Sequence, residues 1–153
     1  AMLGRIDGVN NYLMYSSKIN HWDEPQIIQR PEFAWEYTQI GNCGSPLWTK
    51  EGWLVITHGV GAMRRYCIGA SLLDLNDPSI EIGRLSEPLI APLEEEREGY
   101  VPNVVYSCGS LIHNNSLILP YAVSDYCSTY ATVNLNQFLD ALNKSKNMKV
   151  SKI

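Results

Sequence analysis

A histidine, two arginines and a tyrosine lie close together in the middle of the sequence. His58 is followed by Gly59, Val60 and Gly61, and then by Arg64, Arg65 and Tyr66. An imidazole, a guanidinium and a phenol are directional hydrogen-bond donors, and dense, charge-assisted donors of this kind suit an oxyanion such as phosphate. We therefore predict an oxyanion pocket that contains His58, Tyr66 and one of the two arginines, with Arg65 preferred.

Such a pocket requires the two halves of this segment to face each other. Residues 53–57 (WLVIT) form a short apolar, β-branched run after the turn signal at residues 50–52, which is typical of a strand. The run ends at His58, where we expect the chain to turn. Tyr66 opens the next strand candidate, residues 66–73. If the two strands pair, His58 and Tyr66 lie on either side of one loop.

Most of the remaining chain also has the pattern of short strands between turns. Further strands are expected at residues 12–16, 25–29, 45–49, 80–84, 104–108, 110–113, 117–121 and 129–135, and residues 41–44 are expected to form a loop. Asn114 and Asn115 predict a hairpin turn. Asn134 predicts the N-cap of a short amphipathic helix, Gln137 to Asn143, followed by a frayed tail.

The chain contains a weak internal repeat. Residues 54–60 match residues 117–123 in pattern, at an offset of 63 residues, and each copy lies in a unit of about four short strands. Repeated four-stranded units are typical of the blades of a β-propeller. The sequence holds about two such units and part of an earlier one, which is too few to close a ring.

The composition excludes several classes of function. The chain has 153 residues, enough for one domain, and its net charge of −4 argues against nucleic acid as a partner. No apolar run approaches the ~20 residues that span a membrane, and no signal segment stands at the N-terminus, so we expect a cytoplasmic protein without a membrane partner. The four cysteines lack metal-site or redox spacing, so we expect them to be mostly buried and we expect no metal site.

Four ordered motifs between Gly41 and Leu142 resemble one known family. They read GSPLWTKEGWLVITHGV, YCIGASLLDLNDPSIEIGRLSEPLIAP, EGYVPNVVYSCG and YAVSD. These motifs are similar to the C-terminal half of glycoside hydrolase family 130, the phosphate-dependent β-mannoside phosphorylases and related hydrolases. Agreement is weaker from Gly4 to Trp22.

The resemblance implies roles for several of the residues. Members of the family cleave a β-mannosidic bond with inversion, using phosphate as the nucleophile and one aspartate as general acid. By motif, His58 and Tyr66 match phosphate contacts, with Arg65 as the expected charged partner. Arg5 is a further candidate anion contact. Asp125 matches an aspartate that hydrogen-bonds the sugar.

Two more residues fall in a loop motif near the implied pocket, Tyr100 and Asn103, and are expected on the substrate side. The implied ligands are a β-mannoside or related oligosaccharide, and inorganic phosphate as a co-substrate. No cofactor is expected.

The resemblance also implies the fold. Family members are five-bladed propellers, so we expect an all-β single domain over residues 1–153, an incomplete propeller of about two and a half blades with a short C-terminal helix. The expected divisions are a partial blade at residues 4–40, a blade at 41–95, a blade plus helix at 96–143 and a tail at 144–153.

The expected N-terminal blades, which carry the general acid, have no counterpart in this sequence. Loss of a general acid typically costs ~10²–10⁴ in rate, so the chain is expected to act only when a separate N-terminal half completes it. Unpaired sheet edges at the two end blades also predict self-association. Two alternatives are a non-catalytic remnant that binds carbohydrate or anion, and an interaction module.

Overall fold

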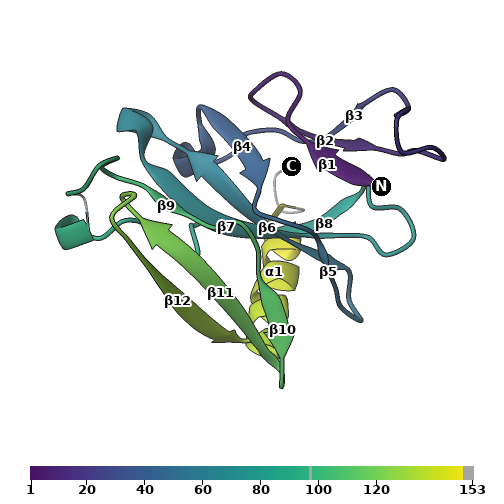
Figure 1. Cartoon of the computed structure of the whole chain (residues 1–153). Helices are drawn as coiled ribbons and strands as arrows, with labels where there is room; N and C mark the ends of the chain where they lie inside the picture. Colours follow the sequence, from purple (N-terminus) through teal and green to yellow (C-terminus); the bar gives the residue numbers. More distant parts are fainter. Residues whose placement is uncertain (97, 150–153) are drawn as a thin grey trace.

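The computed structural model of the chain describes residues 1–96 and 98–149, which are mostly β-sheet with one helix at the C-terminal end (Figure 1). Its strands form three antiparallel sheets. The elements are β1 (Met2–Gly4), β2 (Asn11–Met14), β3 (Gln26–Gln29), β4 (Gln39–Asn42), β5 (Leu47–Trp48), β6 (Trp53–Val60), β7 (Tyr66–Leu73), β8 (Glu81–Arg84), β9 (Val105–Tyr106), β10 (Leu111–His113), β11 (Ser116–Val123), β12 (Cys127–Asn134) and α1 (Leu135–Lys149).

The middle sheet is built on two long strands. β6 and β7 pair along their whole length, β8 lies outside β7, and β4 and β5 follow one another along the other edge of β6. Nearly every residue of β6 and β7 is buried, because both faces of this sheet are covered. One face packs on the third sheet and α1, where Ile56 and Ile68 join Leu117 and Phe138 in the main core.

The first sheet, in the order β1-β2-β3, lies against the opposite face of the middle sheet. The Ile40 amide of β4 donates to the Val9 carbonyl at 2.9 Å, and the Gln29 side chain donates to the Ser71 hydroxyl at 2.6 Å. Leu13, on β2 of the first sheet, is buried. The hydrogen bond from Ile40 thereby holds the loop between β1 and β2 beside β4, at the edge of the middle sheet.

In the third sheet, β11 is flanked by β12 on one edge and by β9 and β10 on the other. The predicted repeat is confirmed: β6 and β11 both have eight residues and begin 63 positions apart, at Trp53 and Ser116. Each has one long antiparallel neighbour and two short strands along its other edge. The division of the chain into propeller blades remains a prediction.

The C-terminal helix is longer than predicted. Its N-cap is confirmed, since the Asn134 side chain accepts from the Gln137 amide at 3.2 Å. The helix begins at Leu135 and runs to Lys149, so most of the predicted tail is helical; residues 150–153 lie outside the described residues. The helix packs along β8, and the Arg84 amide donates to the Ser145 hydroxyl at 3.2 Å, a contact that stabilises the turn beyond the predicted end.

Two further predictions need correction around β6. His58 does not end its strand, which continues to Val60, and the first two residues of the loop predicted at 41–44 belong to β4, which spans Gln39–Asn42. The two differences have one cause, because β4 supplies the partner for the end of β6, with Gly41 opposite His58. Glycine and amide residues have low strand propensity, so this pairing gives no local signal.

Candidate functional site

His58 lies on β6 and faces the third sheet from a buried position, with 6% of its surface exposed. Gly41 stands opposite it on β4, and a Cβ atom there would come within 2.7 Å of Nε2 and closer still to Cε1. The imidazole thus occupies the space that any other residue at position 41 would fill. The Tyr106 ring lies on β9 with its centroid 5.2 Å from that of the imidazole, tilted by 58°.

Arg5 contacts His58 across 53 positions of sequence. Its Nη1 lies 3.2 Å from His58 Nε2. A guanidinium has no acceptor, so Nε2 must accept, and the proton of the neutral ring resides on Nδ1. With the Gln39 amide oriented to satisfy both of its neighbours, its oxygen accepts from Arg5 Nη1 at 2.7 Å and its nitrogen donates to the Gly8 carbonyl at 3.1 Å.

Burial lowers the pKa of His58 to about 4, and the nearby Arg5 guanidinium acts in the same direction. A hydrogen bond to the Asn42 backbone opposes both effects without overcoming them. The ring is therefore neutral at neutral pH, and the positive charge beside it belongs to Arg5.

Two tyrosines complete this part of the site. Tyr66 on β7 is stacked on His58, with ring centroids 6.2 Å apart and ring planes at 15°. Both Tyr66 and Tyr106 are half-buried, and burial raises the pKa of Tyr106. Tyr106 was not predicted; its place in the motif EGYVPNVVYSCG is the signal that could have identified it. We call Arg5, His58, Tyr66 and Tyr106 the anion corner.

The loop with Asn103 lies directly beside the anion corner. The Tyr66 amide donates to the Asn103 carbonyl at 2.9 Å, and Asn103 has a left-handed backbone with φ +62°. These two residues also share a small cavity of about 220 Å³. The same loop is bonded to the β11–β12 turn, because the Val101 amide donates to the Ser124 carbonyl at 3.1 Å and the Ser124 amide to the Val104 carbonyl at 2.8 Å.

Asp125 follows Ser124 in that turn, with φ +50° and an exposed side chain. Tyr100, in the loop with Asn103, is also exposed, at 88%. The β11–β12 turn, this loop and the β6–β7 turn lie at the same end of the sheets (Figure 1). The hydrogen bonds from the loop to Tyr66 and to Ser124 therefore connect the predicted phosphate and sugar residues at that end.

Arg65 has different neighbours. Its Nη2 donates to the Pro92 carbonyl at 3.3 Å, and it lines a cavity of about 690 Å³ together with Trp35 and Cys67. Cys67 and Tyr66 are adjacent on β7 and so point to opposite faces of the sheet. The cation in contact with His58 is thus Arg5 rather than Arg65, whose role in phosphate binding remains a prediction.

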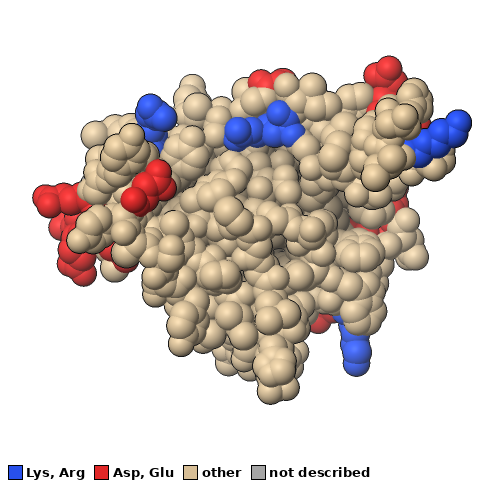
Figure 2. All heavy atoms as spheres, viewed as in Figure 1, with Lys and Arg blue, Asp and Glu red and all other residues tan. Residues whose placement is uncertain are grey.

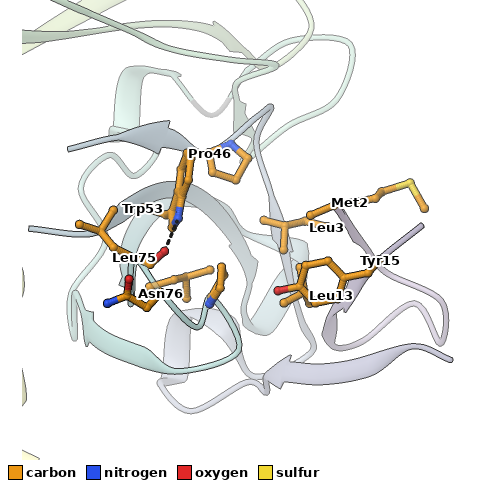
Figure 3. A pocket seen from close by; sticks show the side chains of 11 residues that line it. Met2, Leu3, Leu13, Tyr15, Pro46, Trp53, Leu75 and Asn76 are labelled. Atoms are coloured by element: carbon orange, nitrogen blue, oxygen red, sulfur yellow. Dashed lines mark hydrogen bonds between the residues drawn. The ribbon is translucent and has the colours of Figure 1, made fainter. Parts of the chain in front are cut away.

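A separate apolar pocket of about 470 Å³ lies between the first and middle sheets (Figure 3). It includes Leu3, Leu13 and Trp53, and the Trp53 indole donates to the Leu75 carbonyl at 3.4 Å. Trp53 begins β6 whereas His58 stands near its end, so this pocket is distinct from the anion corner.

Two absences among the described residues bear on the type of site. In residues 1–96 and 98–149, no group of three or more His, Cys, Asp or Glu side chains is placed to hold a metal ion. Within the same ranges, no helix has the length and apolar character needed to cross a membrane.

Cys43 and Cys67 are buried, as expected, but Cys108 and Cys127 are exposed. Cys127 opens β12, an edge strand, and Cys108 lies in the segment between β9 and β10. Both cysteines lie at the solvent-exposed side of the third sheet. The spacing of the cysteines in the sequence does not predict this exposure.

Comparison with known proteins identifies the family. The model of glycoside hydrolase family 130, described as beta-1,4-mannooligosaccharide phosphorylase, matches residues 2–144. A 1,2-beta-oligomannan phosphorylase of Thermoanaerobacter sp. (strain X514) is 38% identical over 116 residues, which are 74% of this chain and 39% of the relative. A beta-1,2-mannobiose phosphorylase of the same organism is 44% identical over 93 residues, covering 60% of this chain and 31% of the relative.

The fold agrees with a solved structure. The beta-1,2-mannobiose phosphorylase of Listeria innocua, in complex with beta-1,2-mannobiose, superposes with a TM-score of 0.80 at 26% identity, over 93% of this chain and 42% of that one. The chain spans between 31% and 42% of the length of these relatives. The chain belongs to glycoside hydrolase family 130.

Proposed function

We propose that the chain supplies the phosphate-binding and part of the sugar-binding machinery of a β-mannoside phosphorylase, and that the general acid comes from outside its 153 residues. The anion corner is the observation that carries this proposal. Arg5 from the β1–β2 loop and Tyr106 from the third sheet meet at the buried imidazole of His58 in the middle sheet. The family to which the chain belongs, and the phosphorylase activity of its named relatives, support phosphate as the anion.

In this proposal the anion corner holds and orients the nucleophile. A phosphate oxygen attacks the anomeric carbon, the bond from that carbon to the bridging oxygen breaks, and the departing sugar oxygen receives a proton from the general acid. Arg5 supplies positive charge, and the phenols of Tyr66 and Tyr106 donate hydrogen bonds to the phosphate. These contacts orient the phosphate and leave one of its oxygens free to attack the sugar. Arg65 is the second proposed cation on the phosphate side.

The sugar lies on the other side of the loop that follows Gly99. Asp125 accepts hydrogen bonds from sugar hydroxyls, and Asn103 and Tyr100 contact the same ligand from that loop. The hydrogen bonds that connect the loop to Tyr66 and to Ser124 support this arrangement. They fix the spacing between the phosphate and sugar sides within one chain.

The fold is proposed to be about two and a half blades of a five-bladed propeller, whose open edges take a second copy or a separate N-terminal half. β12 pairs with β11 on one edge, and six of its eight residues are exposed. Strands β10 to β12 contain no Lys, Arg, Asp or Glu, and this uncharged region forms the lower part of the surface in Figure 2. An uncharged, exposed edge of this length is a ready site for strand pairing.

The test is a chimera. The part of the Thermoanaerobacter beta-1,2-mannobiose phosphorylase that precedes its matched region is fused to this chain, and release of mannose 1-phosphate from β-1,2-mannobiose and phosphate is measured. We expect turnover by the chimera, none by the chain alone, and a loss of at least ~10²-fold in the chimera with His58→Gln. A folded chimera without product that still binds phosphate or mannobiose would refute the proposal and favour the non-catalytic binding remnant.

A further inference from the structure

We propose that the anion corner takes up one proton when it binds a tetrahedral oxyanion, and that His58 receives this proton at Nε2. The inference rests on the proposed phosphate role of the anion corner and concerns the protonation of the imidazole when the anion is bound. It begins from the contact between Arg5 and His58 in the free protein.

In the free protein, His58 cannot donate from Nε2. Arg5 has only donors, so the 3.2 Å contact places a lone pair on Nε2 and the ring proton on Nδ1. An oxyanion has only acceptor atoms to offer this nitrogen. An anion that meets both Arg5 and His58 therefore needs a new proton at Nε2, brought either by a tautomer shift or by uptake from solvent.

The surroundings of Nδ1 oppose a tautomer shift. The Asn42 backbone is hydrogen-bonded to the imidazole, and Cys43 Sγ lies 3.8 Å from Nδ1. Moving the proton from Nδ1 to Nε2 would leave Nδ1 without a proton beside the Cys43 thiol, and the Asn42 backbone favours the protonated ring. Gly41 and Tyr106 enclose the ring, so a ring flip has no room. Uptake of a second proton keeps the Nδ1 contact and creates the missing donor.

Other titratable side chains also surround the ring. They are Arg5 from the β1–β2 loop, Cys43 from the segment after β4, Tyr66 from β7 and Tyr106 from β9. Burial raises the pKa of Cys43 to about 12 and also raises that of Tyr106. His58 is then the group whose protonation a bound anion changes.

The sign of the effect follows from linkage. The pKa of His58 is lowered in the free protein, and a bound dianion within contact distance favours the imidazolium and raises it. Between the free and bound pKa values the complex holds one more proton than the separate partners, so affinity weakens by up to about tenfold for each unit of rising pH.

The experiment is isothermal titration calorimetry of this chain with sulfate. Sulfate is a tetrahedral dianion whose charge does not change near neutral pH, whereas phosphate would add its own titration. Titrations at one pH, somewhat above neutral, in two buffers with different ionisation enthalpies give the number of protons taken up per sulfate. We expect an uptake that approaches one proton, and a dissociation constant that rises by up to about tenfold per pH unit above the free pKa of His58, which is about 4.

Two variants separate the sources of the effect. His58→Gln keeps a side chain that hydrogen-bonds but cannot titrate, so we expect weaker sulfate binding with no proton uptake. Lys50→Gln, on the exposed turn before β6, removes a positive charge away from the anion corner and should leave both quantities as they were. Sulfate binding with no proton uptake would overturn this inference and leave the proposed function standing. Absence of both sulfate and phosphate binding would overturn the anion site itself.

Discussion

Replacing Gly41 with alanine would insert one methyl group into the space that the His58 ring occupies. The new Cβ would lie 2.7 Å from Nε2 and 3.1 Å from Nδ1, both tighter than ordinary van der Waals contact. Gly41 does not have the left-handed backbone that favours glycine, so the effect of the substitution is steric. The ring must move, and Tyr106 and Cys43 stand behind it.

The magnitude follows from the packing. Inserting a methyl group into a well-packed interior costs about 1–3 kcal/mol. For a chain of this size, each kcal/mol lowers the melting temperature by about 2–4 °C, so the expected fall is about 2–12 °C. Displacement of the ring also breaks the Arg5 contact, and we expect sulfate affinity to fall with it.

The assay is thermal unfolding followed by circular dichroism, with sulfate titration on the folded variant. Gly109→Ala is the matched control, since a Cβ there meets nothing within 4 Å. In a double-mutant cycle, His58→Ala removes the clash, so Gly41→Ala should cost at least 0.5 kcal/mol less in that background, an order-of-magnitude bound for residues in contact. Equal melting temperatures for Gly41→Ala and Gly109→Ala would refute the packing described for the anion corner.

Three other outcomes are expected. Arg84→Met should lower the free energy of unfolding in urea by about 3–5 kcal/mol, because it leaves the fully buried Glu36 carboxylate without the guanidinium 3.1 Å away; a loss below about 1 kcal/mol contradicts this. Brief alkylation of native protein, read by peptide mass spectrometry, should modify exposed Cys108 and spare Cys43, since burial raises the pKa of the Cys43 thiol to about 12; equal labelling would show that the thiol is accessible. Thr132→Lys on the β12 edge should reduce self-association measured by light scattering, and a monomeric parent protein would rule out that association.

Local patterns predicted the strands that carry His58 and Tyr66, because both strands are largely apolar and bounded by turn residues. The 63-residue repeat likewise located β6 and β11, the central strands of two similar sheets. Asn134 identified the start of α1 through its side chain, which is a local capping effect. The strand and cap signals each arise within a few residues of sequence, and the repeat is a match between two such local patterns.

The contacts that define the anion corner are not local. Arg5 reaches His58 through the packing of the first sheet on the middle one, and β4 forms a strand because β6 is available to pair with it. Tyr106 joins them from a strand of only two residues. The sequence pattern predicted Arg65 as the cation that binds phosphate, because Arg65 is next to Tyr66 in the sequence. Nearness in sequence does not reveal which arginine lies beside His58 in space.

The proposed anion binding and the proposed turnover can therefore be tested separately. The described contacts that fix the His58 ring, from Arg5, Gly41, Cys43, Tyr66 and Tyr106, come from within the chain. Turnover, in contrast, needs a proton donor for the departing sugar, to which no residue here is assigned. Sulfate binding to the chain alone and mannose 1-phosphate release by the chimera thus test two different parts of the same reaction. A chain that bound neither sulfate nor phosphate, although folded, would show that the corner itself depends on the rest of the propeller.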